Sequence, residues 1–84
     1  MDLKILYFAS LREALGRGEE SLPLPEGVTT VGQLRAYLHA RGEAWQALGE
    51  GRNVRAAVNQ RMARPDDTLQ GGEEVAFFPP VTGG

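Results

Sequence analysis

The chain has 84 residues, a formal net charge of −2 and no cysteine. This length allows one small domain with a single modest core and is too short for two. The charge argues against nucleic-acid binding and favours a partner with a basic surface, while the lack of cysteine excludes disulfides, thiolate metal sites and a cysteine nucleophile.

We expect neither a signal segment nor a membrane span. The first residues lack a charged and then apolar pattern, and no apolar run approaches the roughly 20 residues that a span requires. The expected compartment is therefore the cytoplasm.

The first predicted element is a strand over residues 3–8, which is rich in strand formers and has apolar residues at both alternating positions. That pattern predicts burial on much of both faces. Ser10 and Glu13 then have the spacing of a helix capping box, and one or two helical turns are expected before Gly16.

A second strand is expected over residues 21–24. Pro23 cannot donate a ladder hydrogen bond, which predicts a place at the edge of the sheet. Residues 25–27, Pro-Glu-Gly, then form a turn.

Thr30 and Gln33 repeat the capping-box spacing. Apolar residues at helical intervals follow and predict the principal helix over about residues 31–41. Gly42 is the expected C′ residue of this helix.

The remaining elements are short. One helical turn is expected over residues 44–48, with Trp45 at the edge of the core. A loop of three residues follows, and two of the three are glycines, which favour a loop. The loop covers residues 49–51. Strands are predicted over residues 54–59 and 74–78, and residues 62–63 return beside the strand at 54–59 through a turn near 59–61. Further turns cover residues 65–67 and 70–72.

Alternating strands around one long helix predict an α+β domain, in which one main helix and short helical turns pack on one face of a small mixed sheet. The domain is expected to span residues 1–78. Residues 79–84, Pro-Pro-Val-Thr-Gly-Gly, form the tail. The two prolines direct it away from the last strand in an extended form, and its one reactive group is the terminal carboxylate.

Three segments resemble the small subunit of molybdopterin synthase. They are residues 8–13 followed by Gly16, residues 57–59, and residues 72–84. One departure is Glu73, where the family commonly has aspartate. The resemblance covers essentially the whole chain.

The resemblance implies a β-grasp, ubiquitin-like fold with the first and last strands adjacent. It also implies that Gly84 is adenylated by a ubiquitin-activating-type adenylyltransferase and converted to a thiocarboxylate with sulfur from a donor such as a cysteine desulfurase system. The tail then enters the large synthase subunit, in an expected heterotetramer. There it supplies sulfur to cyclic pyranopterin monophosphate, which forms the molybdopterin dithiolene of the molybdenum cofactor.

The family's functional residues map onto the end of this chain. Gly84 is the sulfur-bearing residue, and the segment threaded into the partner includes Gly83, Thr82 and Val81. The docking surface is expected at Phe77, Phe78, Pro79 and Pro80. Consecutive strand residues point to opposite faces, so one phenylalanine should be core; the family analogy favours Phe78 as the contact.

No cofactor is expected on the chain itself. Residues 49–51 lack the pattern of a phosphate-binding loop, so the activating enzyme must supply the site for ATP. His39 is the single histidine and has no cysteine or second histidine to complete a metal site. The chain is thus predicted to be a carrier and cosubstrate, and to be part of an enzyme only together with the large subunit.

Three alternatives remain open at this point. The carrier could supply sulfur to thiazole or to tRNA thiolation, because such carriers share the diglycine. It could be a ubiquitin-like modifier that forms isopeptide bonds through Gly84. In the third, the tail is a frayed end without function, and Arg12 is a solvated side chain rather than a partner contact.

Overall fold

The computed structural model describes residues 2–48 and 53–79. In chain order the elements are β1 (Asp2–Tyr7), α1 (Ala9–Leu15), β2 (Glu19–Pro23), α2 (Val31–His39), the 3-10 helix η1 (Glu43–Leu48), β3 (Arg55–Val58), β4 (Arg61–Ala63) and β5 (Glu74–Phe78). The loop predicted over residues 49–51 and the tail residues 80–84 lie outside the described residues.

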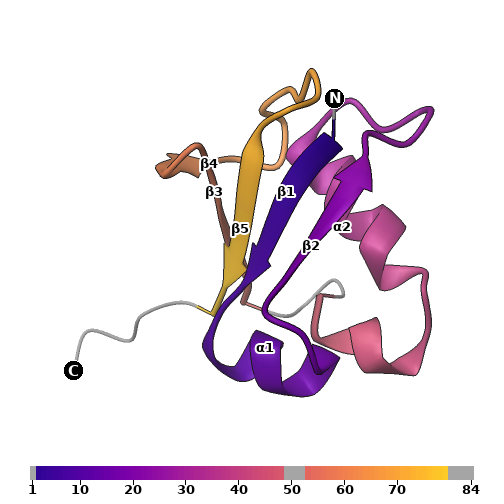
Figure 1. The fold of residues 1–84 in the computed structure, drawn as a ribbon, viewed down its shortest axis with the longest axis vertical. Coiled ribbons are helices and arrows are strands. Elements are labelled where there is room, and N and C mark those ends of the chain that lie inside the picture. Colours follow the sequence, from indigo (N-terminus) through magenta and orange to yellow (C-terminus); the bar gives the residue numbers. More distant parts are fainter. Residues whose placement is uncertain (1, 49–52, 80–84) are drawn as a thin grey trace.

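The strands form one mixed sheet in the order β2-β1-β5-β3-β4. The first and last strands, β1 and β5, pair in parallel at its centre, and the other neighbours are antiparallel. Helix α2 lies across one face of this sheet (Figure 1). This arrangement is a β-grasp fold, so the predicted α+β class and the adjacency of the terminal strands are confirmed. Pro23 is on an edge strand, as predicted.

The core lies between the sheet and α2. Its fully buried side chains alternate along β1 and β5 and repeat at helical spacing on α2: Leu3, Ile5, Tyr7, Val75, Phe77, Leu34 and Leu38. Trp45 joins them with 9% of its surface exposed. Complete burial of an aliphatic or phenylalanine side chain stabilises the fold by about 1.5–3 kcal/mol.

The prediction that the first strand is buried on both faces is wrong. Lys4 is exposed, Leu6 is half-buried and Phe8 has 47% of its surface exposed. The described helices lie on the side that buries Tyr7, so none of them covers the apolar residues that point to the other face of the strand.

The capping box of α2 is confirmed, since the Thr30 hydroxyl accepts from the Gln33 N–H and the Gln33 side chain accepts from the Thr30 N–H. The predicted end is wrong. The helix stops at His39, and Arg41 N–H bonds to Leu38 O in a tighter turn. Gly42 is not the C′ residue, because the C-cap is Ala40 and the residue after it is Arg41. The Gly42 carbonyl accepts from Trp45 N–H at the start of η1.

The capping role predicted for Ser10 is also wrong. Helix α1 begins two residues earlier than a Ser10 cap requires, at Ala9, with Phe8 as the N-cap residue and no side-chain hydrogen bond at the cap. Strand β1 runs into the helix with no intervening loop, which places Ser10 inside the first turn.

Strands β3 and β4 form the predicted hairpin, closed by Asn59 and Gln60 at positive φ of 51° and 68°. Asn59 also fastens the hairpin to β5. Its N–H donates to Glu74 O at 2.8 Å, and its side-chain Oδ1 accepts from Glu74 N–H at 3.0 Å. Glu73, the departure from the family pattern, closes the preceding turn by accepting from the N–H groups of Gln70 and Gly71.

Candidate partner-docking site on the open face of the sheet

The predicted site residues begin on β5, which lies between β1 and β3. Phe77 points into the core, is fully buried and stacks on Tyr7 with ring centroids 6.4 Å apart. Its side chain therefore anchors the strand and is not available for contact with a partner in this structure.

Phe78 points to the opposite face, where it is half-buried and pairs across the ladder with Arg55; Pro79 follows, also half-buried. The prediction that the two phenylalanines divide between core and surface is confirmed. The other predicted site residues, Pro80, Val81, Thr82, Gly83 and Gly84, lie outside the described residues.

Phe8 is a candidate site residue that the sequence interpretation missed. Its N–H donates to Phe77 O at 3.1 Å, which extends the β1–β5 ladder beyond Tyr7 and places Phe8 beside Phe78. Strict alternation from Tyr7 could have identified it, because a residue next to a buried neighbour in a strand points to the other face.

A row of apolar side chains crosses the same face. Leu6 pairs with Ala76, Ala76 with Ala57, and Ala57 with Met62, which has 66% of its surface exposed. Together with the two phenylalanines they form what we call the open-face patch: Leu6, Phe8, Ala57, Met62, Ala76 and Phe78. Contiguous apolar surface of this kind is a candidate interaction site.

Charged side chains border the patch on the same face. Lys4 lies 3.8 Å from the carboxylate of Glu19 and pairs in register with Glu74. An apolar centre with a charged rim is the usual anatomy of a protein interface.

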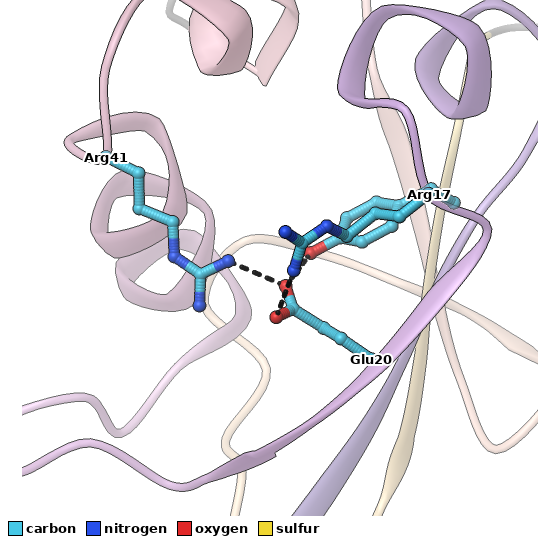
Figure 2. Close-up of polar contacts among 4 residues, drawn as sticks. Arg17, Glu20 and Arg41 are labelled. Carbon is cyan, nitrogen blue, oxygen red and sulfur yellow. Dashed lines mark hydrogen bonds and ion pairs between the residues drawn. The ribbon is translucent and has the colours of Figure 1, made fainter.

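A polar cluster secures β2 and the helices on the other side of the sheet. The Tyr7 hydroxyl donates to Glu20 at 2.5 Å, and Arg41 and Arg17 contact the same carboxylate at 2.8 and 3.2 Å. Figure 2 shows the two arginines converging on Glu20. Both guanidinium groups also lie near the Trp45 ring, at 4.7 Å for Arg41 and 5.7 Å for Arg17.

This cluster changes two pKa values. Burial, helped by the hydrogen bond to Glu20, raises the pKa of Tyr7, which stays a neutral donor. Burial alone would raise the pKa of Glu20, but the hydrogen bonds from Tyr7 and Arg41 and the charges of both arginines outweigh it and lower that pKa. The cluster is a structural clasp between β1, β2 and the helices.

The single histidine and the acidic residues of the turn over 65–67 do not gather at the patch. His39 contacts Gln46 at 3.4 Å, and Asp67 accepts from Arg64 N–H within that turn. Among residues 2–48 and 53–79, no group of three or more histidine, aspartate or glutamate side chains could hold a metal ion. In the same part of the chain, no helix is long and apolar enough to cross a membrane.

A groove lies on the helix side of the sheet, between α2 and the β3–β4 hairpin, and is lined by Val31, Arg35, Leu48 and Ala56 among others. Of the predicted site residues that the structure describes, Phe77 alone contributes to it. The groove and the open-face patch are therefore separate surfaces.

The fold and the patch define a ubiquitin-like β-grasp protein whose last strand ends at an apolar surface. Residues 5–84 match the ThiS family, and the chain belongs to that family. It is 40% identical to the molybdopterin synthase sulfur carrier subunit of Escherichia coli over 82 residues, which are 98% of this chain and 99% of that protein.

Solved structures agree on the fold. Small archaeal modifier protein 1 from Haloferax volcanii has a TM-score of 0.78 and 26% identity, with 100% of both chains covered. A chain in the complex of subunits 1 and 2 of the molybdopterin-converting factor from Helicobacter pylori has a TM-score of 0.65 and 19% identity, also over 100% of both chains, and supports the fold alone.

Proposed function

We propose that this chain is the sulfur carrier subunit of a molybdopterin synthase. The observation that carries the proposal is 40% identity, over nearly the full length of both proteins, to a carrier subunit of that name. The open-face patch supports it, because a carrier must bind a larger protein. Phe78 and Pro79 lie where the chain continues from the patch toward its diglycine end.

The chemistry that we propose takes place at Gly84. A carboxylate is a poor electrophile, so one of its oxygens first attacks the α-phosphorus of ATP on an adenylyltransferase, and pyrophosphate leaves. The terminal sulfur of a persulfide, from a donor such as a cysteine desulfurase system, then displaces AMP and forms an acyl disulfide. A thiol reductant cleaves its S–S bond, which leaves the thiocarboxylate on Gly84 and the donor's thiol. ATP belongs to the activating enzyme, and this chain acts as cosubstrate.

Docking is assigned to the two surface aromatics and the start of the tail. Phe8 and Phe78 supply apolar area next to the point where the chain leaves the sheet, and aromatic side chains at interface centres carry much of the binding energy. Pro79 and Pro80 limit the freedom of the segment that follows. We propose that Val81, Thr82 and Gly83 then thread into the large subunit, in a heterotetramer, and present sulfur to cyclic pyranopterin monophosphate.

Intact-mass spectrometry tests the first half of this proposal. The chain is incubated with an activating enzyme, ATP and a sulfur source. Replacement of one oxygen by sulfur should add about 16 Da. A variant without Gly84 and a reaction without ATP are the controls and should gain nothing. An unchanged mass, with an activating enzyme that modifies another carrier in parallel, would contradict the proposal.

The second half is tested by transfer. The thiocarboxylated chain is mixed with the large subunit and cyclic pyranopterin monophosphate, and the dithiolene product and the loss of sulfur from the carrier are measured together. Sulfur that goes instead to a thiazole precursor or to tRNA would identify one of the other carrier pathways, as would copurification of a different large partner.

A protein-modifier role is the second candidate, because one of the similar structures is named a small archaeal modifier protein, at 26% identity over both full chains. In that case Gly84 would form an isopeptide bond with lysines of other proteins. Proteolytic digestion and mass spectrometry would find the terminal residues of this chain attached to lysine, with no sulfur delivered to the pterin precursor.

A further inference from the structure

Ala9, the first residue of α1, has a backbone conformation that L-amino acids avoid. Its φ is 54°, in the left-handed region, where Cβ crowds the following carbonyl oxygen. Asn59 and Gln60 also have positive φ, but a two-residue hairpin requires it at both positions. Ala9 is in no hairpin, so its conformation needs another cause.

The cause lies in how Phe8 is held. Its N–H donates to Phe77 O and its carbonyl accepts from Leu11 N–H, each at 3.1 Å. Phe8 itself is extended, with φ −120° and ψ 155°. One residue thus ends the sheet ladder and opens the helix, and the change in chain direction falls on Ala9.

The same junction gives up local stability in two other ways. No side chain caps α1, and nearly half of the Phe8 side chain is exposed to solvent, at 47%. Departures from local rules that gather at one place are typical of functional sites. This place adjoins Phe78, where the chain leaves the sheet.

We propose that the left-handed turn at Ala9 is a positioning device for partner docking. It holds the Phe8 ring on the open face beside Phe78, so that both rings meet the partner as a preformed apolar pair. A preformed contact avoids the cost of ordering side chains on binding. Ala9 is a positioning residue and needs no contact of its own; the inference rests on the proposed function.

Two replacements of Ala9 distinguish the effect of backbone strain at this residue from the effect of its conformational rigidity. Ala9→Gly accepts the observed φ but also samples many other conformations. Replacement of Ala9 by D-alanine, through chemical synthesis of the chain, retains the Cβ and favours positive φ. Ala14→Gly, at an exposed position of the same helix, is the control for the general effect of glycine in α1.

The measurements are the dissociation constant for the large synthase subunit, by calorimetry, and the midpoint of urea denaturation. We expect Ala9→Gly to raise the dissociation constant about three- to tenfold, with a midpoint no lower than that of the wild type because glycine relieves the Cβ clash. The D-alanine variant should bind within about twofold of the wild type and have a higher midpoint. Ala14→Gly should lower the midpoint and leave binding unchanged.

Wild-type binding by Ala9→Gly would overturn the inference, as would equal weakening in the glycine and D-alanine variants. If the wild-type chain binds the large subunit and supplies sulfur, and the Ala9 variants bind with the same dissociation constant, only the role proposed for Ala9 fails. If the wild-type chain itself does not bind the large subunit, the proposed function fails and this inference with it.

Discussion

Phe77 and Phe78 are consecutive residues of β5 that serve opposite sides of one sheet. The first is fully buried against Tyr7, and the second is half-buried on the open face beside Arg55. In the strand that leads to the tail, Phe77 therefore anchors the strand in the core and the adjacent Phe78 presents a side chain on the surface.

Alanine at each of these positions should have opposite effects. Phe77→Ala removes a core ring and should lower the free energy of unfolding by about 3–5 kcal/mol. Phe78→Ala should lower it by less than about 1 kcal/mol but weaken binding to the large subunit about tenfold or more. Urea denaturation and calorimetry measure the two quantities. Unchanged affinity for Phe78→Ala, in a folded protein, would remove Phe78 from the docking surface.

Glu20 should make the stability of the fold depend on acid pH. Its pKa is lower in the folded chain than in the unfolded one, so its contribution is complete above the unfolded pKa and is lost as pH falls through the folded pKa. At pH 7, Glu20→Gln should cost about 1–2 kcal/mol, because charged hydrogen bonds become neutral ones.

The difference between wild type and Glu20→Gln should shrink below about pH 4. Urea denaturation across pH 2.5 to 7, a range chosen around the ordinary carboxyl pKa of about 4.3, follows it. A difference that stays constant over that range would mean that the clasp between Glu20 and its arginines does not exist in solution.

Thr30 and Ser10 form a matched pair, since both had the spacing of a capping box. Thr30→Ala removes the hydroxyl that accepts from Gln33 N–H and should cost about 1 kcal/mol. Ser10→Ala should change stability by less than about 0.5 kcal/mol, because Ser10 lies within the first turn of α1. Thermal denaturation of both variants measures the two losses of stability. A larger loss for Ser10→Ala than for Thr30→Ala would contradict the assignment of Thr30, and not Ser10, as a helix cap.

Gln60→Gly should stabilise the protein. Gln60 has φ 68° in the two-residue turn between β3 and β4, and such turns prefer Asn-Gly. Relief of the Cβ clash should add about 1 kcal/mol. Arg61→Gly, on the adjacent strand residue, is the control and should not stabilise. A lower urea midpoint for Gln60→Gly would show that the turn differs from the one described.

Much of the fold could be predicted because its signals are local. The alternation over residues 3–8 identified β1, the Thr30 and Gln33 pair identified the start of α2, and Pro23 placed β2 at an edge. Each of these depends on a side chain and the backbone within a few residues of it, so the sequence contains the whole interaction.

Most of the errors arose where a distant element decides the outcome. Ser10 is a residue type that often caps helices. The pairing of β1 with β5 continues through Phe8, however, and Phe8 becomes the N-cap, so the helix begins before Ser10. Gly42 is a residue type that often ends helices, but the C-cap falls at Ala40, and the Gly42 carbonyl accepts from Trp45 N–H at the start of η1. Glu20 is an ordinary charged residue of an edge strand until Tyr7, Arg17 and Arg41 meet around it.

By itself, the sequence determined most of the elements and the α+β class, because propensity and capping are properties of the chain alone. Only the tertiary structure decided that no described helix covers one face of the sheet, and that Phe8 and Phe78 lie together on that face. The reason is physical: a side chain becomes surface or core only when the packing of the helices has chosen which face of the sheet to cover.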